Sequence, residues 1–260
     1  MRRSILHVGR FGLAPGAIIL ISTATLHAAD TLPKDGAWAR YYVQSKGPDG
    51  TEHTFHTTIR FVGTVVEKGK RCRWVEWTEA VPADGDDGKK TIRKSVLKFL
   101  FTEKSLRESS QPLPEFIRGW SGEEGKPPSP LETTQRNRET TNISGTNLVF
   151  LPGVLKTAKA TRNPRTVDYQ QGQLRLKTGR SGTYEAVYHP STVPLVFTWK
   201  TDYELWLHRD VPLGMASTRM KMVFIRKDAK GKKTVRDLAT IEWWVEAWGT
   251  DAKSAFPDAK

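Results

Sequence analysis

The chain has 260 residues, of which 41 are lysine or arginine and 28 are aspartate or glutamate, giving a formal charge of +13. Hydrophobic residues make up 37% of the sequence and nine residues are tryptophan, which is enough apolar material for one large domain or two small ones. This composition excludes a chain that is disordered throughout. The single cysteine, Cys72, excludes a disulfide-stapled scaffold and a cysteine-rich zinc or iron–sulfur site.

The first 28 residues have the pattern of an export signal. Three arginines and no acid precede an apolar run at 16–21, and small residues end at Ala28-Ala29. The apolar run is far shorter than the stretch of about 20 residues that spans a bilayer. We therefore predict a Sec-type signal peptide over residues 1–28 and a periplasmic or secreted protein that does not span the membrane. Cleavage after Ala24, and export by the twin-arginine route on Arg2 and Arg3, are the alternatives.

Removal of this signal leaves residues 29–260 with a charge of +10, because the signal contains three arginines and no acid. Nucleic acid is a poor partner for an exported protein, so we do not assign the basic charge to nucleic-acid binding. An unpaired cysteine is tolerable in an oxidising compartment when it is buried. Cys72 lies in a strand-like run, and we predict a buried, inert thiol.

Alternation of apolar and polar residues with a period of two dominates the N-terminal part. In the run 51–66, Phe55, Ile59 and Phe61 alternate with more polar residues, a pattern typical of a β-strand. Clusters of Gly, Pro, Asp and Lys separate such runs and predict turns. We expect strands at 38–44, 51–66, 72–77 and 91–101, joined as an antiparallel meander by turns at 47–50, 68–70 and 84–88.

The middle of the chain has a different composition. Residues 112–120 (PLPEFIRGW) predict one short helix that buries Phe116 and Ile117. Residues 121–147 are rich in Gly, Pro, Ser, Thr and charge with almost no large apolar side chain, and predict a flexible loop, with a helical turn at 131–138 as an option.

The C-terminal part returns to the strand pattern. Residues 241–248 fit both a strand and a helix face, and the tryptophans there favour the strand. We expect strands at 147–151, 166–169, 173–177, 183–189, 194–207, 215–226 and 234–248. The predicted fold class is mainly β: a single domain over 29–260 with one large curved antiparallel sheet, either a half-barrel or an open barrel, and a short helical and loop insertion.

The order of the predicted segments resembles that of the periplasmic lipoprotein-carrier (LolA/LolB-like) half-barrel: a signal, a long meander, an interrupting helix and loop, and a closing meander. The segments KRCRWVE at 70–76 and DVPLGM at 210–215 also resemble uncharacterised secreted proteins of planctomycete-type bacteria. The half-barrel resemblance implies an apolar concave face that holds acyl chains and is partly covered by helices. This chain departs from that pattern in having few helical segments.

Motifs for phosphate, metal or nucleophile chemistry are not found in the sequence. The acidic turn at 84–88 lacks the glutamate that completes a calcium loop. His53 and His56 fall on opposite faces of a strand, where they cannot share a metal ion. We therefore predict neither a metal site nor a cofactor.

Three carboxylates near tryptophans raise the question of a glycosidase-like cleft. Glu242 and Glu246 flank Trp244, but four residues along a strand separate them by about 13 Å, more than the about 5–9.5 Å that glycosidases use. Cross-strand pairing with Glu76 would be needed to bring two acids together. A solvent-facing role is the simpler interpretation.

Large aromatic and methionine side chains are the most informative feature. Adjacent Trp243 and Trp244 must point to opposite faces, as must Trp74 and Trp77, so both faces of the sheet carry apolar area. One face can pack the core, and the other is either covered or forms a concave binding surface. The candidate ligand-binding residues are Trp74, Trp77, Trp199, Trp206, Met220, Met222, Phe224, Trp243 and Trp244, and no residue is predicted to be catalytic.

The leading functional hypothesis is a non-catalytic extracytoplasmic binding or carrier protein for an apolar ligand, either a lipid or a lipidated chain such as a lipoprotein. The alternative is a basic adhesion or scaffold module that binds anionic envelope polymers through lysine-rich turns at 67–73, 89–94 and 226–236. A hydrolase using Glu76, Glu242 or Glu246 is the third hypothesis.

Overall fold

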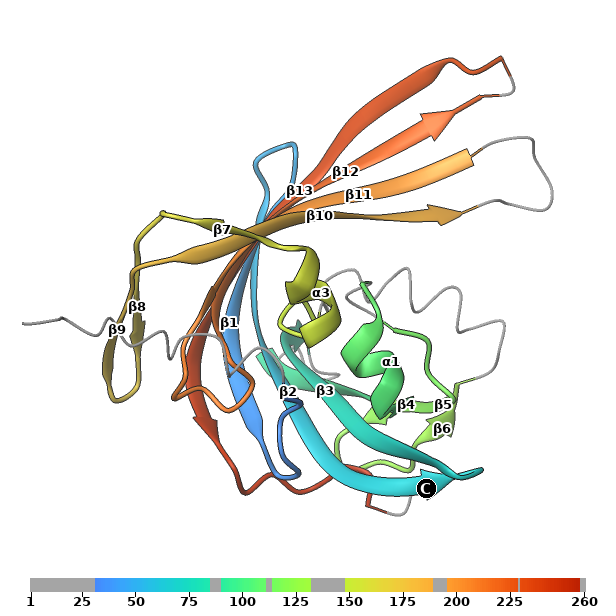
Figure 1. The fold of residues 1–260 in the computed structure, drawn as a ribbon, viewed down its shortest axis with the longest axis vertical. Coiled ribbons are helices and arrows are strands. Elements are labelled where there is room, and N and C mark those ends of the chain that lie inside the picture. The colour runs from blue at the N-terminus through green and yellow to red at the C-terminus, as the bar shows by residue number, and fades with distance from the viewer. Residues whose placement is uncertain are drawn as a thin grey trace, which may run out of the picture.

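One large antiparallel sheet forms the framework of the molecule (Figure 1). The computed structural model describes residues 31–84, 90–110, 114–131, 148–188, 196–228 and 230–257. The eleven strands of the sheet lie in the order β6-β5-β4-β3-β2-β1-β13-β12-β11-β10-β7, and its two edge strands, β6 and β7, do not pair with each other. The sheet is therefore an open, strongly curved half-barrel, and the predicted fold class is confirmed.

The strand bounds follow the sequence pattern closely in most of the chain. The N-terminal strands are β1 (Trp38–Lys46), β2 (Glu52–Glu67), β3 (Lys70–Asp84), β4 (Lys90–Thr102), β5 (Arg118–Glu123) and β6 (Ser129–Pro130). The C-terminal strands are β7 (Lys159–Thr161), β8 (Arg165–Tyr169), β9 (Gly172–Leu176), β10 (Gly179–Tyr188), β11 (Val196–Leu207), β12 (Met215–Lys227) and β13 (Lys233–Gly249). The ambiguous segment 241–248 is part of strand β13, as predicted.

Alternation sets the two faces of the sheet, and local irregularities bend it. In β1 the odd-numbered Tyr41 and Val43 are buried while Tyr42 and Gln44 are only partly so. The tight β2–β3 turn has positive φ angles at Lys68 (49°) and Gly69 (73°), as a two-residue hairpin requires. Register shifts interrupt the β1–β13, β2–β3, β11–β12 and β12–β13 pairings, and such bulges increase the twist and bend of strands.

Two short helices, α1 (Glu103–Glu108) and α3 (Pro152–Thr157), lie inside the curve of the sheet (Figure 1). Thr102 caps α1 by accepting a hydrogen bond from the Ser105 backbone N–H at 3.0 Å. Pro152 occupies the start of α3, where its missing N–H leaves no helical bond unmade. The helices mark one side of the sheet as its concave face.

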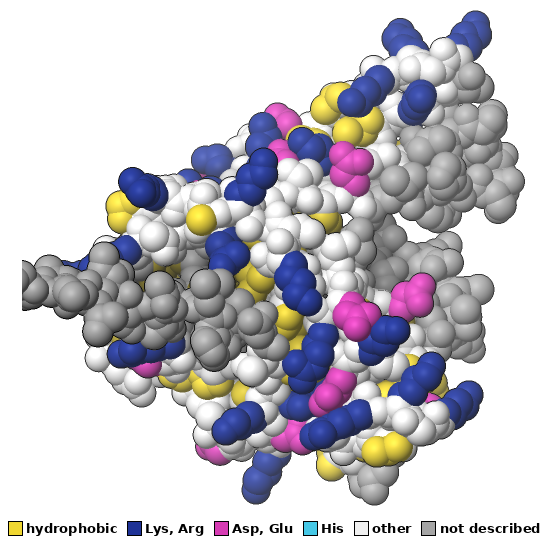
Figure 2. Space-filling view, viewed as in Figure 1, with side chains coloured by type: hydrophobic (Ala, Val, Ile, Leu, Met, Phe, Trp, Pro, Cys, Tyr) yellow, Lys and Arg dark blue, Asp and Glu magenta, His cyan; other side chains and the backbone are white. Residues whose placement is uncertain are grey.

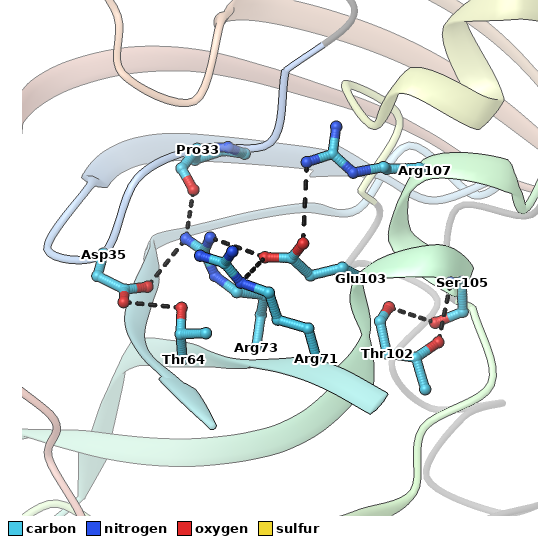
Figure 3. Close-up of polar contacts among 9 residues, drawn as sticks. All are labelled: Pro33, Asp35, Thr64, Arg71, Arg73, Thr102, Glu103, Ser105 and Arg107. Carbon is cyan, nitrogen blue, oxygen red and sulfur yellow. Dashed lines mark hydrogen bonds and ion pairs between the residues drawn. The ribbon is translucent and has the colours of Figure 1, made fainter. Parts of the chain in front are cut away.

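A buried arginine fastens α1 to the N-terminal segment (Figure 3). Arg73 of β3 donates to the carbonyl of Pro33 at 2.5 Å and pairs with Asp35 at 2.9 Å and Glu103 of α1 at 3.4 Å. Arg71 pairs with the same Glu103 carboxylate at 3.2 Å. This network holds the helical cover in place at one end of the concave face.

The convex face is covered by two other parts of the chain. The β8–β9 hairpin packs beside β13, where Tyr169 stacks on Trp248 at 4.6 Å and the Gln170 N–H donates to the Glu246 carbonyl at 3.1 Å. The C-terminal segment after β13 crosses β3 and β4, and Lys98 donates to the Phe256 carbonyl at 2.7 Å. Both faces of the sheet are thus covered over part of their area.

Two predicted elements are wrong. The expected helix at 112–120 is not formed, since residues 114–117 are irregular and residues from Arg118 onward pair with β4 as β5, while Phe116 packs on Phe99 at 4.7 Å. The expected strand at 147–151 is, from Leu148, a turn leading into α3. The predicted signal peptide at 1–28 lies outside the described residues, as does 132–147 of the predicted loop.

Candidate ligand-binding site

The helix-covered part of the concave face is packed core. Trp77 contacts Phe99 edge-on with ring centroids 5.4 Å apart, and Tyr41 contacts Trp243 at 5.7 Å. The Tyr41 hydroxyl donates to the Met215 carbonyl at 3.1 Å, and burial raises the pKa of Tyr41 far above its usual range. All of these side chains are fully buried, so this part of the face serves stability.

The same face continues beyond the helices along the extended ends of β10 to β13, which project from the body (Figure 1). The β11–β12 pairing shows which residues form this face: Tyr203 pairs with Met220, and further out Trp199 pairs with Phe224. Phe197 stacks on Phe224 at 5.4 Å, and Trp199 contacts the same ring at 5.4 Å. We call Phe197, Trp199 and Phe224 the aromatic shelf; each is only half-buried, whereas Met220 is fully buried.

Further half-buried apolar side chains border the open part of the concave face. They are Phe55 of β2, Leu97 of β4, Tyr184 of β10, and Leu238 and Ala239 of β13, all packed against the main core. Apolar surface that stays accessible next to a rigid core is the usual setting of a ligand-binding concavity. The open end of the concave face is therefore the candidate site.

Polar atoms interrupt this apolar face at three strands. The Thr57 Oγ1, Trp77 Nε1 and Trp243 Nε1 atoms are buried without a hydrogen-bond partner within the described residues. Glu79 of β3 is half-buried on the same face, and burial raises the pKa of its carboxyl above the usual range. A buried polar atom left unpaired costs about 1–3 kcal/mol, so such groups need an explanation.

Six of the nine predicted ligand-binding residues share the concave face. Trp77, Met220, Met222 and Trp243 are buried in its core, and Trp199 and Phe224 belong to the aromatic shelf. Only the last two of these six present substantial surface to a ligand in this structure.

The other three predicted residues lie on the convex face. Trp74 lies under the cations of Lys98, at 4.9 Å, and Arg118, at 5.5 Å. The Trp206 Nε1 atom donates to the Asn163 carbonyl at 2.7 Å, beneath the segment that precedes β8. Trp244 packs against Tyr42 at 4.8 Å. The structure therefore separates these three tryptophans from the candidate site.

Sequence reasoning missed the polar residues Thr57 and Glu79 of this face. It also missed the half-buried apolar residues Phe55, Leu97, Tyr184, Phe197, Leu238 and Ala239. Alternation could have found them, because Thr57 is in phase with Phe55, Glu79 with Trp77, and Phe197 with Trp199. What the sequence does not carry is which of these positions stays accessible once the helices are in place.

The three acids of the hydrolase hypothesis are not brought together. Glu76 lies on β3, and two strands, β2 and β1, separate it from Glu242 and Glu246 on β13. Burial alone would raise the pKa of Glu242, but hydrogen bonds from Arg165 and Arg219, each at 2.8 Å, hold it below the usual range. Glu246 is bound by His56 at 2.8 Å and Arg40 at 3.2 Å. Each acid thus serves its own local ion pair.

Other chemistry finds no support in the described part of the chain. It contains no group of three or more His, Cys, Asp or Glu residues placed to hold a metal ion, and no helix long and apolar enough to cross a membrane. Cys72 is buried, as predicted, and desolvation raises the pKa of its thiol. A shallow groove of about 390 Å³ beside β4 is lined by Thr91, Ile92, Arg93, Lys94, Glu123 and Glu124, and ion pairs bridge it.

No protein-family model matches the chain, and no curated protein matches it by sequence. Solved structures similar to the chain include a candidate exported protein with a YmcC-like fold from Bacteroides fragilis, with 8% identity and a TM-score of 0.25 over 84% of this chain and 97% of the other. A candidate lipoprotein from Parabacteroides distasonis has 6% identity and a TM-score of 0.30 over 84% and 97% of the two chains.

A LolA superfamily protein from Nitrosomonas europaea is also similar, with 10% identity and a TM-score of 0.28 over 90% of this chain and 94% of the other. It carries the name of the superfamily that the sequence pattern resembles, whereas the planctomycete likeness stays a prediction. TM-scores this low carry no argument about function, so the function has to be inferred from this chain's own residues.

Proposed function

We propose that the protein is an extracytoplasmic, non-catalytic carrier that holds an apolar ligand, a lipid or a lipidated chain, on the open end of its concave face. The observation that carries this proposal is the aromatic shelf, whose three rings are half-buried and extend the row of buried Met220 and Met222 outward along β11 and β12. The export signal expected at 1–28 supports the location outside the cytoplasm.

The shelf suits an alkyl or acyl chain for a physical reason. Burying each methylene group contributes about 0.8 kcal/mol, so a chain lying across several strands can bind without any polar contact. The rings of the shelf stand on β11 and β12, which are paired along their whole length, so the surface is formed before the ligand arrives. Little conformational entropy is then lost on binding.

Displacement of a neutral fluorescent probe, N-phenyl-1-naphthylamine, by dodecanol tests this proposal. We expect the protein to bind the probe and the Trp199→Ala, Phe224→Ala double variant to bind it at least about tenfold more weakly, because two of the three rings are lost. Ile225→Ala is the matched control, since Ile225 follows Phe224 on the same strand and points to the opposite face. Absence of probe binding by the folded protein, or equal binding by the double variant, would contradict the proposal.

A second candidate function, binding of an anionic envelope polymer, is favoured by the β12–β13 hairpin. Figure 2 shows lysine and arginine side chains gathered at the far end of this hairpin. Its cations Arg226, Lys227, Lys230, Lys232, Lys233 and Arg236 have no ion pair within the described residues. The carboxylate of the nearby Asp228 accepts hydrogen bonds from the backbone N–H groups of Lys230 and Lys232 instead.

Binding to immobilised heparin, as a model polyanion, tests this second function. We expect retention that falls steeply with salt and a large loss of retention in the Lys230→Glu, Lys232→Glu, Lys233→Glu variant. The same charge reversal at Lys104, which is exposed on α1, is the control. Retention that does not respond to salt, or an equal loss in the control, counts against a binding role of the hairpin.

A further inference from the structure

Glu79 lies on the concave face beside Thr57, whose hydroxyl has no hydrogen-bond partner within the described residues. Glu79 of β3 is the cross-strand partner of Thr57 of β2, and Trp77 is two residues away on the same strand and hence on the same face. Thr57 and Trp77 are each only 1% exposed, and within the described part of the chain neither Thr57 Oγ1 nor Trp77 Nε1 has a hydrogen-bond partner. The half-buried Glu79 carboxyl group therefore lies across from the Thr57 side chain and diagonally across from the half-buried Phe55 of β2 and Leu97 of β4, where the packed core meets the open part of the face.

Nothing in the described chain neutralises Glu79. It makes no hydrogen bond and no ion pair there, and desolvation is the cause of its raised pKa. The charged groups that share the face on neighbouring strands are His53 of β2, Arg93 of β4 and Glu123 of β5. His53 is exposed, and Arg93 and Glu123 pair with each other at 3.3 Å.

The lack of a partner sets Glu79 apart in a chain with a large excess of cations. Glu76, Glu242 and Glu246 are also buried or partly buried, and each is held by lysine, arginine or histidine. A half-buried carboxyl group in an apolar face is costly to ionise unless a cation approaches it. The group that completes this cluster is therefore expected to come from outside the described chain.

We propose that Glu79 receives the polar head of the bound amphiphile, and that this head is a cationic amine. This inference rests on the proposed carrier function and adds the chemistry of the ligand. The ammonium group pairs with the Glu79 carboxylate, while the alkyl chain lies on the half-buried side chains of Phe55 and Leu97, which border the open part of the concave face on the two neighbouring strands.

The positive net charge of the protein provides a sharp test of this proposal. A basic protein attracts anions in general, so without a specific site it would prefer a fatty acid to a fatty amine. A preference for the amine has to come from a local carboxylate. Three probes with twelve carbon atoms each, dodecylamine, dodecanol and dodecanoate, have a cationic, a neutral and an anionic head at neutral pH.

Competition of these three probes against N-phenyl-1-naphthylamine, below their micelle concentrations, is the experiment. We expect dodecylamine to bind at least about tenfold more tightly than dodecanoate, and Glu79→Gln to bring the two affinities to within about twofold of each other. Glu185→Gln is the matched control, because Glu185 is exposed on the opposite face of β10 and its replacement changes the net charge equally. The control is expected to keep the preference for the amine.

The outcomes separate this inference from the carrier function. If dodecanol and dodecanoate bind as tightly as dodecylamine, or if Glu79→Gln keeps the preference, the head-group site is wrong while the carrier function stands. If none of the three probes and no apolar dye binds the folded protein, both fail. Loss of the preference in Glu185→Gln as well as in Glu79→Gln would assign it to net charge and would overturn the site.

Discussion

Glu76 and Glu79 are three residues apart on β3 and point to opposite faces of one sheet, but their surroundings differ in every respect. Glu76, on the convex face, is fully buried and accepts hydrogen bonds from the Ser254 hydroxyl and from the Ala255 N–H at 2.9 Å, with Lys98 at 3.9 Å. Glu79, on the concave face, is half-buried with no partner in the described chain. The Glu76 carboxylate has a structural role, whereas the Glu79 carboxyl group is available to bind a ligand.

This difference shows that the cover of each face decides the role of a side chain. The C-terminal segment brings a hydroxyl and backbone groups to Glu76 and completes its coordination. On the concave face, α1 pairs with Arg73 near the start of β3, and Glu79 lies six residues further along that strand. An identical residue type on the same strand therefore becomes a structural group on one side and a candidate ligand contact on the other.

Removing the partner of Glu76 is expected to have the largest effect. In Lys98→Ala, a fully buried carboxylate loses its cation and the Phe256 carbonyl loses a donor, so we expect a loss of about 3–5 kcal/mol in the free energy of unfolding. Urea unfolding measures this value. Lys94→Ala, on the same face of β4 but in an exposed pair with Glu124, is expected to lose about 1 kcal/mol or less. Equal losses in the two variants would show that the Glu76 cluster is not structural.

The two ends of the concave face can be compared in the same way. Trp243 is 1% exposed, and Trp243→Ala is expected to cost about 3–5 kcal/mol because it leaves a large cavity in the core. Trp199→Ala, on the half-buried shelf, is expected to cost about 1–2 kcal/mol. Thermal unfolding of both variants checks the order. A loss for Trp199→Ala as large as that for Trp243→Ala would mean that the shelf belongs to the core.

The smallest effect on the free energy of unfolding is expected for Glu79→Gln, and this substitution is expected to stabilise the protein rather than destabilise it. Burial raises the pKa of Glu79 in the folded protein, so the folded state binds its proton more tightly than the unfolded state does. The free energy of unfolding therefore falls as the pH rises from the usual range of glutamate through the raised pKa. Glu79→Gln removes this penalty and should be slightly more stable than the natural protein at neutral pH, with the difference vanishing in acid.

Urea midpoints measured across this pH range test that sign. Glu185→Gln, an exposed change on the opposite face, should show no such dependence. A Glu79→Gln variant that is less stable than the natural protein at neutral pH would show that Glu79 has a structural partner.

Much of the fold could be predicted because period-two alternation is strong wherever one strand face is buried. Phe55, Ile59 and Phe61 in β2, and Met220, Met222 and Phe224 in β12, mark the concave face directly in the sequence. The helices could not be predicted in the same way, because each has only six residues, too short for a helical period. Their signals are local instead: Thr102 caps α1 and Pro152 starts α3.

The candidate site was only partly predictable for a different reason. Alternation assigns Trp77 and Trp199 to one face and Trp74 to the other, but it does not reveal which are covered. Cover comes from contacts between distant parts of the chain, such as the bond from Lys98 to Phe256 across 158 positions. Such contacts leave no periodic trace in the sequence.

The position of β1 has a consequence for how the molecule folds. β1 is the first strand that the structure describes, but it lies in the middle of the sheet, where Trp38 pairs with Gly249 of the last described strand, β13. The N-terminal meander can form early, because its strands are neighbours in the sequence. The other edge of β1 has to pair with β13, which lies almost 200 residues further along the chain. Closing so long a loop is slow, so we expect the two halves to join in the rate-limiting step, and a chain that lacks β13 to expose an unpaired central strand and to aggregate.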